Sequence, residues 1–76
     1  TTIKFALPNS GPVSLVVYDI AGRLVKTLVN GNMEATNHSV VWNGRDSSDR
    51  QVSSGVYYYR LVADGFTDTR KMMLVK

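Results

Sequence analysis

The sequence contains no cysteine and only one histidine. A disulfide framework, which often supports small extracellular folds, is therefore excluded. A zinc site of the usual kind is excluded too, because His38 has no Cys or second His to complete a ligand set. A Ser-His-Asp centre would have to use His38, which lies inside a strand-like run, and the chain has no nucleophile elbow. We therefore predict no catalytic, metal or cofactor site and expect that the chain is not an enzyme.

Long apolar runs and a clustered charge of one sign are also missing. No stretch approaches the roughly 20 apolar residues that a membrane helix needs, so we expect no transmembrane segment. Nine Lys and Arg against six Asp and Glu give a net charge of +3, but the basic residues are scattered among the acidic ones. This distribution favours a solvated β surface over a nucleic-acid footprint, and no nucleic-acid partner is expected.

What the chain does contain is a repeated alternation of apolar and polar residues. Its 76 residues are enough for one domain, residues 1–76, with a small core. The strand-like pattern begins directly at Thr1, which suggests a domain taken from a larger protein. The strand-like runs cover residues 1–7, 13–19, 23–29, 38–42, 56–63 and 66–76. Short strands separated by turns, without helices, predict an all-β antiparallel sandwich.

Turn residues separate these runs. Asp19 to Gly22 predicts a hairpin, because Gly22 can take the positive φ that a tight turn needs. Asn30-Gly31-Asn32 and Asp64-Gly65 predict further turns. The apolar spacing within residues 23–29 would also suit one face of a helix, but the run is short and flanked by glycines, so we predict a strand.

The stretch from Trp42 to Leu61 raises the question of whether its aromatic residues form a binding surface or a core. Tyr57, Tyr59 and Leu61 share one face of a strand, and this face should point inward because Arg60 on the other face prefers water. Trp42 ends its own strand just before a turn, where a small domain needs a large apolar group. The predicted core comprises Phe5, Leu15, Val17, Trp42, Tyr57, Tyr59, Leu61 and Met72. The alternative, a sugar-binding platform of Trp42, Tyr18 and Tyr58, is less favoured.

The polar loop between Asn43 and Ser54 contains Asp46-Ser47-Ser48-Asp49, which could lend oxygen atoms to calcium. Two carboxylates fall short of the ligand number that calcium prefers, and the spacing of a known calcium loop is absent. Asp at a turn commonly accepts hydrogen bonds from the backbone just ahead of it. We therefore predict a turn held by Asx hydrogen bonds.

Several short motifs resemble a known family when they are taken in order. They are Tyr18-Asp19 with Gly22-Arg23, Trp42 with Gly44 and Asp46, Ser54-Gly55-Val56-Tyr57 with Arg60-Leu61, and Lys71-Met72. Their order and spacing resemble the C-terminal sorting domain (type A) of type IX secretion cargo, and the related Ig-like domain of flagellar hook-capping proteins. The resemblance covers essentially the whole chain. It implies a small Ig-like or fibronectin-III-like antiparallel β-sandwich of about six to seven strands.

The chain also departs from the family pattern. Thr36 and Asp49 stand where the family usually has Gly, and Gln51 stands where Pro is frequent. Because a β-branched residue at positive φ is an outlier, we expect the 30–38 connection to be reshaped. Gly55 opens a strand, where we expect a side chain to crowd its neighbour.

The resemblance implies a non-catalytic sorting domain that directs a secreted cargo protein through the type IX secretion system, for release or attachment to the cell surface. Its partners would be outer-membrane secretion machinery proteins and the parent cargo protein. It would act in a Gram-negative bacterium, secreted or at the cell surface after passage through the periplasm. The alternatives are a structural Ig-like spacer or assembly module and, less favoured, a carbohydrate-binding module.

The final strand is the expected recognition element, because a terminal β-segment can pair with a partner by strand addition. An ordinary closing strand is the alternative interpretation. The recognition residues predicted here are Thr69, Arg70, Lys71, Met72, Met73, Leu74, Val75 and Lys76. The sequence predicts no oligomeric state.

Overall fold

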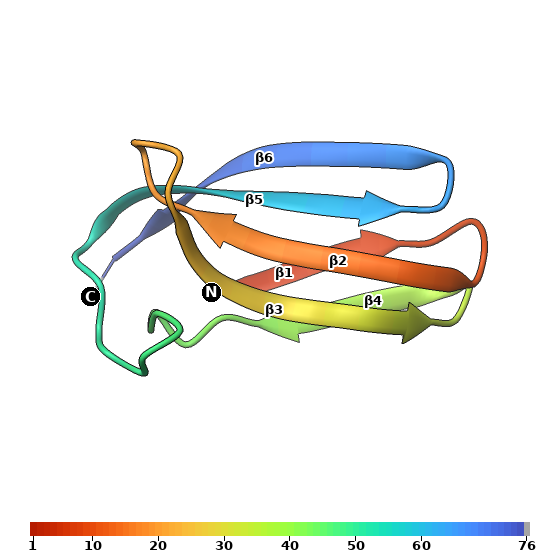
Figure 1. Ribbon diagram of the computed structural model, residues 1–76, viewed down its shortest axis with the longest axis horizontal. Helices are drawn as coiled ribbons and strands as arrows, with labels where there is room; N and C mark the ends of the chain where they lie inside the picture. Colours follow the sequence, from red (N-terminus) through yellow and green to blue (C-terminus); the bar gives the residue numbers. More distant parts are fainter. Residues whose placement is uncertain (76) are drawn as a thin grey trace.

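The computed structural model describes residues 1–75, which form a small antiparallel β-sandwich (Figure 1). Among these residues there are six strands and no helix. The strands are β1 (Thr2–Ala6), β2 (Gly11–Tyr18), β3 (Leu24–Met33), β4 (Asn37–Val41), β5 (Gly55–Ala63) and β6 (Phe66–Leu74). The predicted all-β fold is confirmed, and so is the strand in the ambiguous run 23–29.

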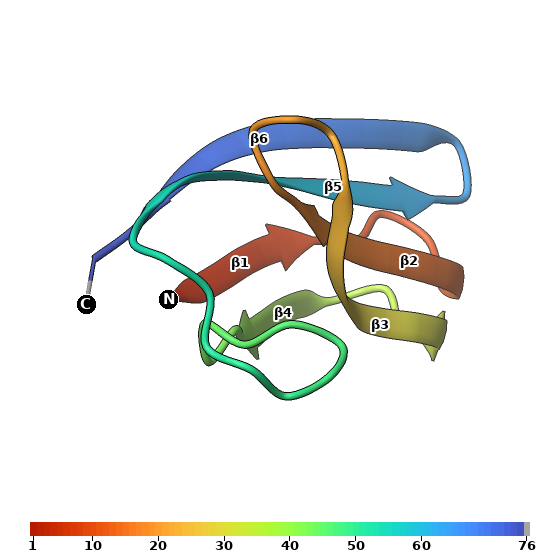
Figure 2. The same cartoon turned by 60° about the vertical axis from the view of Figure 1, so that its left-hand side comes forward.

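The strands form two sheets that pack face to face. The larger sheet has the order β3-β2-β5-β6, and the smaller one pairs β1 with β4. All neighbouring strands run antiparallel. Figure 2 shows β1 and β4 as a separate pair, below β5 and β6 and beside β2 and β3. This strand order places β3 and β6 at the two edges of the larger sheet.

Two clusters of buried side chains fill the space between the sheets. The first comprises Ile3, Leu7, Val13, Leu15 and Leu61, and the second comprises Val17, Val25, Trp42, Tyr57 and Leu74. Five of the eight predicted core residues are buried, namely Leu15, Val17, Trp42, Tyr57 and Leu61. The other three, Phe5, Tyr59 and Met72, are half-buried and pack against the clusters. Leu15 and Val17 have no exposed surface, which shows that β2 forms the centre of the core.

Two irregularities of β3 explain the helix-like spacing of its apolar residues. The register against β2 shifts between Leu15 and Val16 and again between Val17 and Tyr18. Each shift leaves one residue of β3 without a partner on β2, first Leu28 and then Val25. A β-bulge changes which face the following residues occupy, so strict alternation is lost. Val25 is thereby directed into the core, where it is buried.

The turn predicted at Asn30-Gly31-Asn32 is wrong. These residues continue β3, with Asn30 opposite Ser14 and Gly31 opposite Val13. The ladder with β2 provides backbone hydrogen bonds along this segment, and this long-range pairing outweighs the local turn preference. The chain turns after Met33 instead, where the Thr36 amide donates to the Glu34 carbonyl at 2.9 Å.

Backbone geometry accounts for four positions that the sequence singled out. Gly22 has a φ of +82°, and its amide closes the predicted hairpin by donating to the Asp19 carbonyl at 3.0 Å. Asp49, with a φ of +64°, is the only non-glycine residue at positive φ in the described part of the chain, so Thr36 avoids the strained conformation. The prediction that a side chain in place of Gly55 would crowd its neighbour is wrong. A Cβ there would meet no atom within 4 Å, and it is the φ of +151° that favours glycine.

Candidate functional site: an open sheet edge and a basic aromatic face

Strand β6 is the most regular open edge of the larger sheet. It pairs only with β5, over nine consecutive residue pairs without a register shift. The opposite edge, β3, carries two bulges, and the Ser47 amide and hydroxyl both donate to the Val25 carbonyl there, at 3.0 and 3.2 Å. Bulges and covering loops prevent strand addition, whereas a regular open edge permits it. Of the two edges of the larger sheet, β6 is therefore the better suited to accept another strand.

The predicted recognition residues divide into two groups by the exposure of their side chains. Exposed side chains belong to Thr69, Arg70, Lys71, Met73 and Val75. Leu74 is buried and Met72 is half-buried against the core, so they can offer a partner little beyond their backbone. Lys76 lies outside the described residues. The recognition role of this segment stays a prediction.

An ion pair lies on the inward row of β6, the row that shares its face with the core. The Arg70 guanidinium donates through Nε to the Asp68 carboxylate at 2.9 Å. This hydrogen bond raises the pKa of Arg70. Both side chains keep substantial exposure, 66% for Arg70 and 42% for Asp68. The inward row of β6 thus has a charged pair in its middle. Phe66 and Met72 lie on either side of this pair and present apolar surface to the core.

A basic aromatic face, defined by Tyr18, Tyr58, Arg60 and Lys71, covers the outside of the larger sheet next to β6. Tyr18 lies opposite Tyr58, and the guanidinium carbon of Arg60 lies 5.4 Å from the centroid of the Tyr18 ring. This distance is within the range of a cation–π contact. Lys71 pairs across the strands with Tyr58. The outward rows of β5 and β6 carry these two cations and no carboxylate.

The aromatic question raised by the sequence is answered by burial. Trp42 keeps 1% of its surface, so it cannot serve as a sugar-binding platform. Its indole Nε1 donates to the Arg45 carbonyl at 3.0 Å, which fixes the start of the 43–54 loop. The Tyr57 hydroxyl donates to the Ser53 carbonyl at 2.7 Å and fixes the end of the same loop.

The predicted Asx turn is present in that loop. One carboxylate oxygen of Asp46 accepts hydrogen bonds from the amides of Ser48 and Arg50, at 2.9 and 3.0 Å. The bond from Arg50, followed by the one from Ser48, holds the pKa of Asp46 below its ordinary value. Residues 1–75 contain no group of three or more side chains that could hold a metal ion together. The loop carboxylate is thus used for internal structure.

His38 is likewise occupied within the fold. Its Nε2–H donates to the Glu34 carbonyl at 2.7 Å, and its ring stacks on Phe5 with centroids 5.4 Å apart. Both contacts join β4 to its neighbours. As for membrane insertion, the described residues include no helix long and apolar enough to cross a bilayer.

Comparisons with known proteins agree with this architecture. Residues 1–65 match the FlgD Ig-like domain family. The fold is similar to a crystal structure of FlgD from P. aeruginosa, with a TM-score of 0.67 and 32% sequence identity. The similarity covers 97% of this chain and 61% of that chain, so the sequence spans less than two thirds of that protein. No curated protein matches the sequence.

These findings bear on one half of the predicted resemblance. They confirm the relation to the Ig-like domain of flagellar hook-capping proteins, and they do not extend to type IX sorting domains. The family match ends at Gly65, immediately before β6. The sequence match over most of the chain and the structural similarity over nearly all of it show that this chain belongs to the FlgD Ig-like domain family.

Proposed function

We propose that this domain is a non-catalytic structural and assembly module of a longer protein. Its family membership and its size relative to FlgD, of which it matches 61%, support this interpretation. The observation that carries it is the position of the two chain ends, which both lie in the same half of an elongated domain of 35 × 19 × 19 Å.

Trp42 lies toward this half of the domain, which we call the Trp42 pole. The Trp42 amide donates to the Thr1 carbonyl at 2.8 Å, and the Thr1 amino group donates to the Trp42 carbonyl at 3.3 Å. Leu74, close to the other end, packs in the same cluster as Trp42. Figures 1 and 2 show both ends on the same side of the domain.

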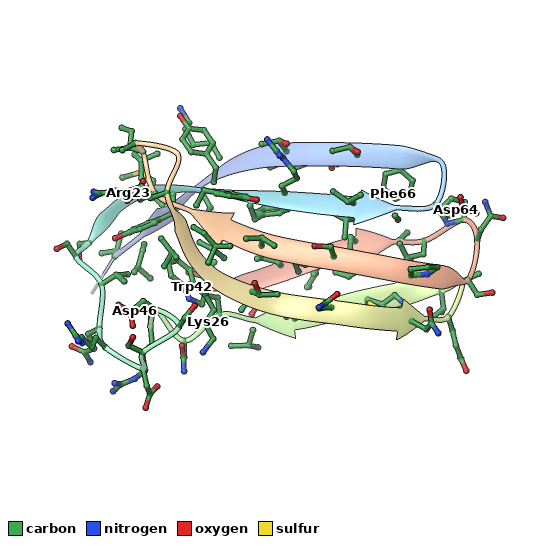
Figure 3. All side chains as sticks on the ribbon, viewed as in Figure 1. Arg23, Lys26, Trp42, Asp46, Asp64 and Phe66 are labelled. Carbon is green, nitrogen blue, oxygen red and sulfur yellow. The ribbon has the colours of Figure 1, made fainter. Side chains whose placement is uncertain are left out.

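The opposite pole consists of turns. Figure 3 shows Trp42 and Asp46 toward one end of the domain, with Asp64 and Phe66 toward the other. Chain joined to either terminus would therefore leave from the Trp42 pole. The module then projects from its parent protein, with the turn pole, the open β6 edge and the basic aromatic face available to partners.

The test is a replacement in the parent protein. Exchanging the domain for a flexible Gly/Ser linker should leave the remaining domains folded and reduce the assembly of the parent, measured by light scattering after size-exclusion chromatography. Unchanged assembly in the linker variant would contradict the proposal. A Val41→Ala variant of the intact protein is the matched control, because this side chain is 68% exposed on the outside of the smaller sheet.

Type IX sorting is a second candidate, supported by the location of the predicted recognition segment on the open β6 edge. In this proposal, outer-membrane secretion machinery recognises β6, and the parent cargo becomes secreted or surface-attached after crossing the periplasm of a Gram-negative host. A passenger fused to the domain should move from the periplasm to the medium or cell surface of a type IX-competent host. A passenger that stays periplasmic, in a host that exports its own cargo, would rule sorting out.

A further inference from the structure

We infer that two copies of this domain associate through their β6 strands, which pair antiparallel around a twofold axis at Thr69. The result is one continuous sheet across both copies, with the two smaller sheets on the same side. The inference goes beyond the proposed function and does not depend on it, because it rests on β6 alone.

The first step concerns which backbone groups of β6 are available. Asp64-Gly65 is a two-residue hairpin loop closed by the pair Ala63 and Phe66. The pair that closes such a loop is hydrogen-bonded, and hydrogen-bonded pairs alternate along an antiparallel ladder. The inward residues Phe66, Asp68, Arg70 and Met72 therefore direct their N–H and C=O groups toward β5. The residues with backbone groups facing the open edge are Thr67, Thr69, Lys71 and Met73.

The second step is the choice of register. A twofold axis at Asp68, at Arg70 or at Lys71 would place that residue directly opposite its own copy. Like charges directly opposite one another are destabilising. An axis at Thr69 avoids this and lets its open N–H and C=O pair with those of the second Thr69. Among these four registers, only this one has no like-charged pair at its centre.

The same register also makes the inward rows complementary. It places Asp68 opposite Arg70 of the second copy, and Arg70 opposite the second Asp68. The existing 2.9 Å ion pair within each strand then becomes part of a four-charge network with alternating signs. Networks of this kind contribute more than isolated surface pairs. Just beyond the charges, the half-buried Phe66 lies opposite Met72 of the second copy.

The outward row is compatible with this pairing. Thr69 meets Thr69, a favourable cross-strand pair, and Thr67 meets Lys71. The contact is limited to one strand edge. It therefore buries less surface than a standard protein–protein interface, which buries about 1,600 Å². Association should therefore be weak and depend on protein concentration.

Charge reversal tests the register. Asp68→Arg and Arg70→Asp each replace the complementary pairs by like charges, so each variant should be monomeric at concentrations where the parent chain dimerises. An equimolar mixture of the two variants restores opposite charges at both positions and should form a heterodimer. Sedimentation equilibrium measures all three samples, and circular dichroism verifies that each variant is folded. Lys4→Asp is the matched control, because it makes the same charge change as Arg70→Asp at an exposed position of β1, away from β6, and should leave dimerisation within about twofold.

Cysteine cross-linking tests the position of the twofold axis. Because the sequence contains no native cysteine, any disulfide must involve the introduced residue. Thr69→Cys places two thiols opposite each other, within the Cα separation that a disulfide spans. Thr67→Cys is the control, because its two copies would lie about 13 Å apart along the strands. We expect rapid disulfide formation only for Thr69→Cys. A chain that is monomeric at millimolar concentration, a mixture of charge variants that does not associate, or equal cross-linking of both cysteine variants would each overturn the inference.

Discussion

The indole of Trp42 meets the phenol ring of Tyr57 edge to face, with ring centroids 5.2 Å apart and an interplanar angle of 71°. This geometry is favourable because the positive edge of one ring points at the negative face of the other. The two residues flank the 43–54 loop, and each sends one hydrogen bond to its backbone. The aromatic pair therefore closes the core and fixes the loop.

Truncating Trp42 should destabilise the domain strongly. Trp42→Ala removes the largest fully buried side chain and should lower the free energy of unfolding by about 3–5 kcal/mol. Urea denaturation followed by circular dichroism measures this loss. Val41→Ala at the preceding position, the last residue of β4, where the side chain is 68% exposed, should change stability by less than about 0.5 kcal/mol. Equal effects of the two substitutions would show that Trp42 does not hold the core together.

The Tyr57 hydroxyl should make a smaller contribution. Tyr57→Phe keeps the ring in the core but removes the 2.7 Å hydrogen bond to the Ser53 carbonyl. The expected loss is about 0.5–1.5 kcal/mol, together with faster amide hydrogen exchange in the 43–54 loop. Tyr58→Phe, on the outer face of the same strand, is the control and should leave exchange in this loop unchanged. A loop whose exchange is insensitive to Tyr57→Phe would contradict the anchoring role.

Two glycines of the larger sheet should respond oppositely to alanine. Gly55→Ala forces a side chain onto a φ of +151° and should cost about 1–3 kcal/mol, even though the space around it is open. Gly31→Ala has equally open space without a positive φ, and should be neutral or stabilise by up to about 1 kcal/mol. Thermal unfolding of both variants measures these two changes in stability. A neutral Gly55→Ala would show that the strand tolerates another backbone conformation there.

Acid should destabilise the domain through Asp19 and Asp46. Backbone hydrogen bonds from Arg23 and Arg50, respectively, are the largest cause that lowers each carboxyl pKa below the ordinary 3.8. A carboxyl with a lowered folded pKa adds stability above its unfolded pKa, and this stability is lost as the pH falls through the folded pKa. The free energy of unfolding should therefore decrease as the solution is acidified below about pH 4.

The matched variant for this pH effect is the double substitution Asp19→Asn and Asp46→Asn. Each asparagine keeps an oxygen acceptor for the turn amides but does not titrate. The loss of stability between about pH 5 and about pH 2.5, measured by urea denaturation, should be smaller in the double variant than in the parent chain. An identical loss in both would place the acid sensitivity at other carboxylates.

Local alternation in the sequence determined which faces of the strands are buried. In β5, the charge of Arg60 identified the outward row, and Tyr57 and Leu61 are buried on the other. Hairpins at Asp19 to Gly22 and at Asp64-Gly65 were predictable because their turn residues act within a few positions of the chain. The Asx turn at Asp46 followed from the same local chemistry.

Long-range pairing decided what these local patterns could not. Pairing with β2 kept Asn30 to Asn32 in a strand and introduced the bulges that direct Val25 inward. Packing against Trp42 buried Leu74, whose own segment indicated an exposed recognition strand. The strand order alone made β6 an open edge. The sequence thus determined the strands and their faces, because side-chain alternation is local, whereas the edges and chain ends depend on contacts between residues far apart along the chain.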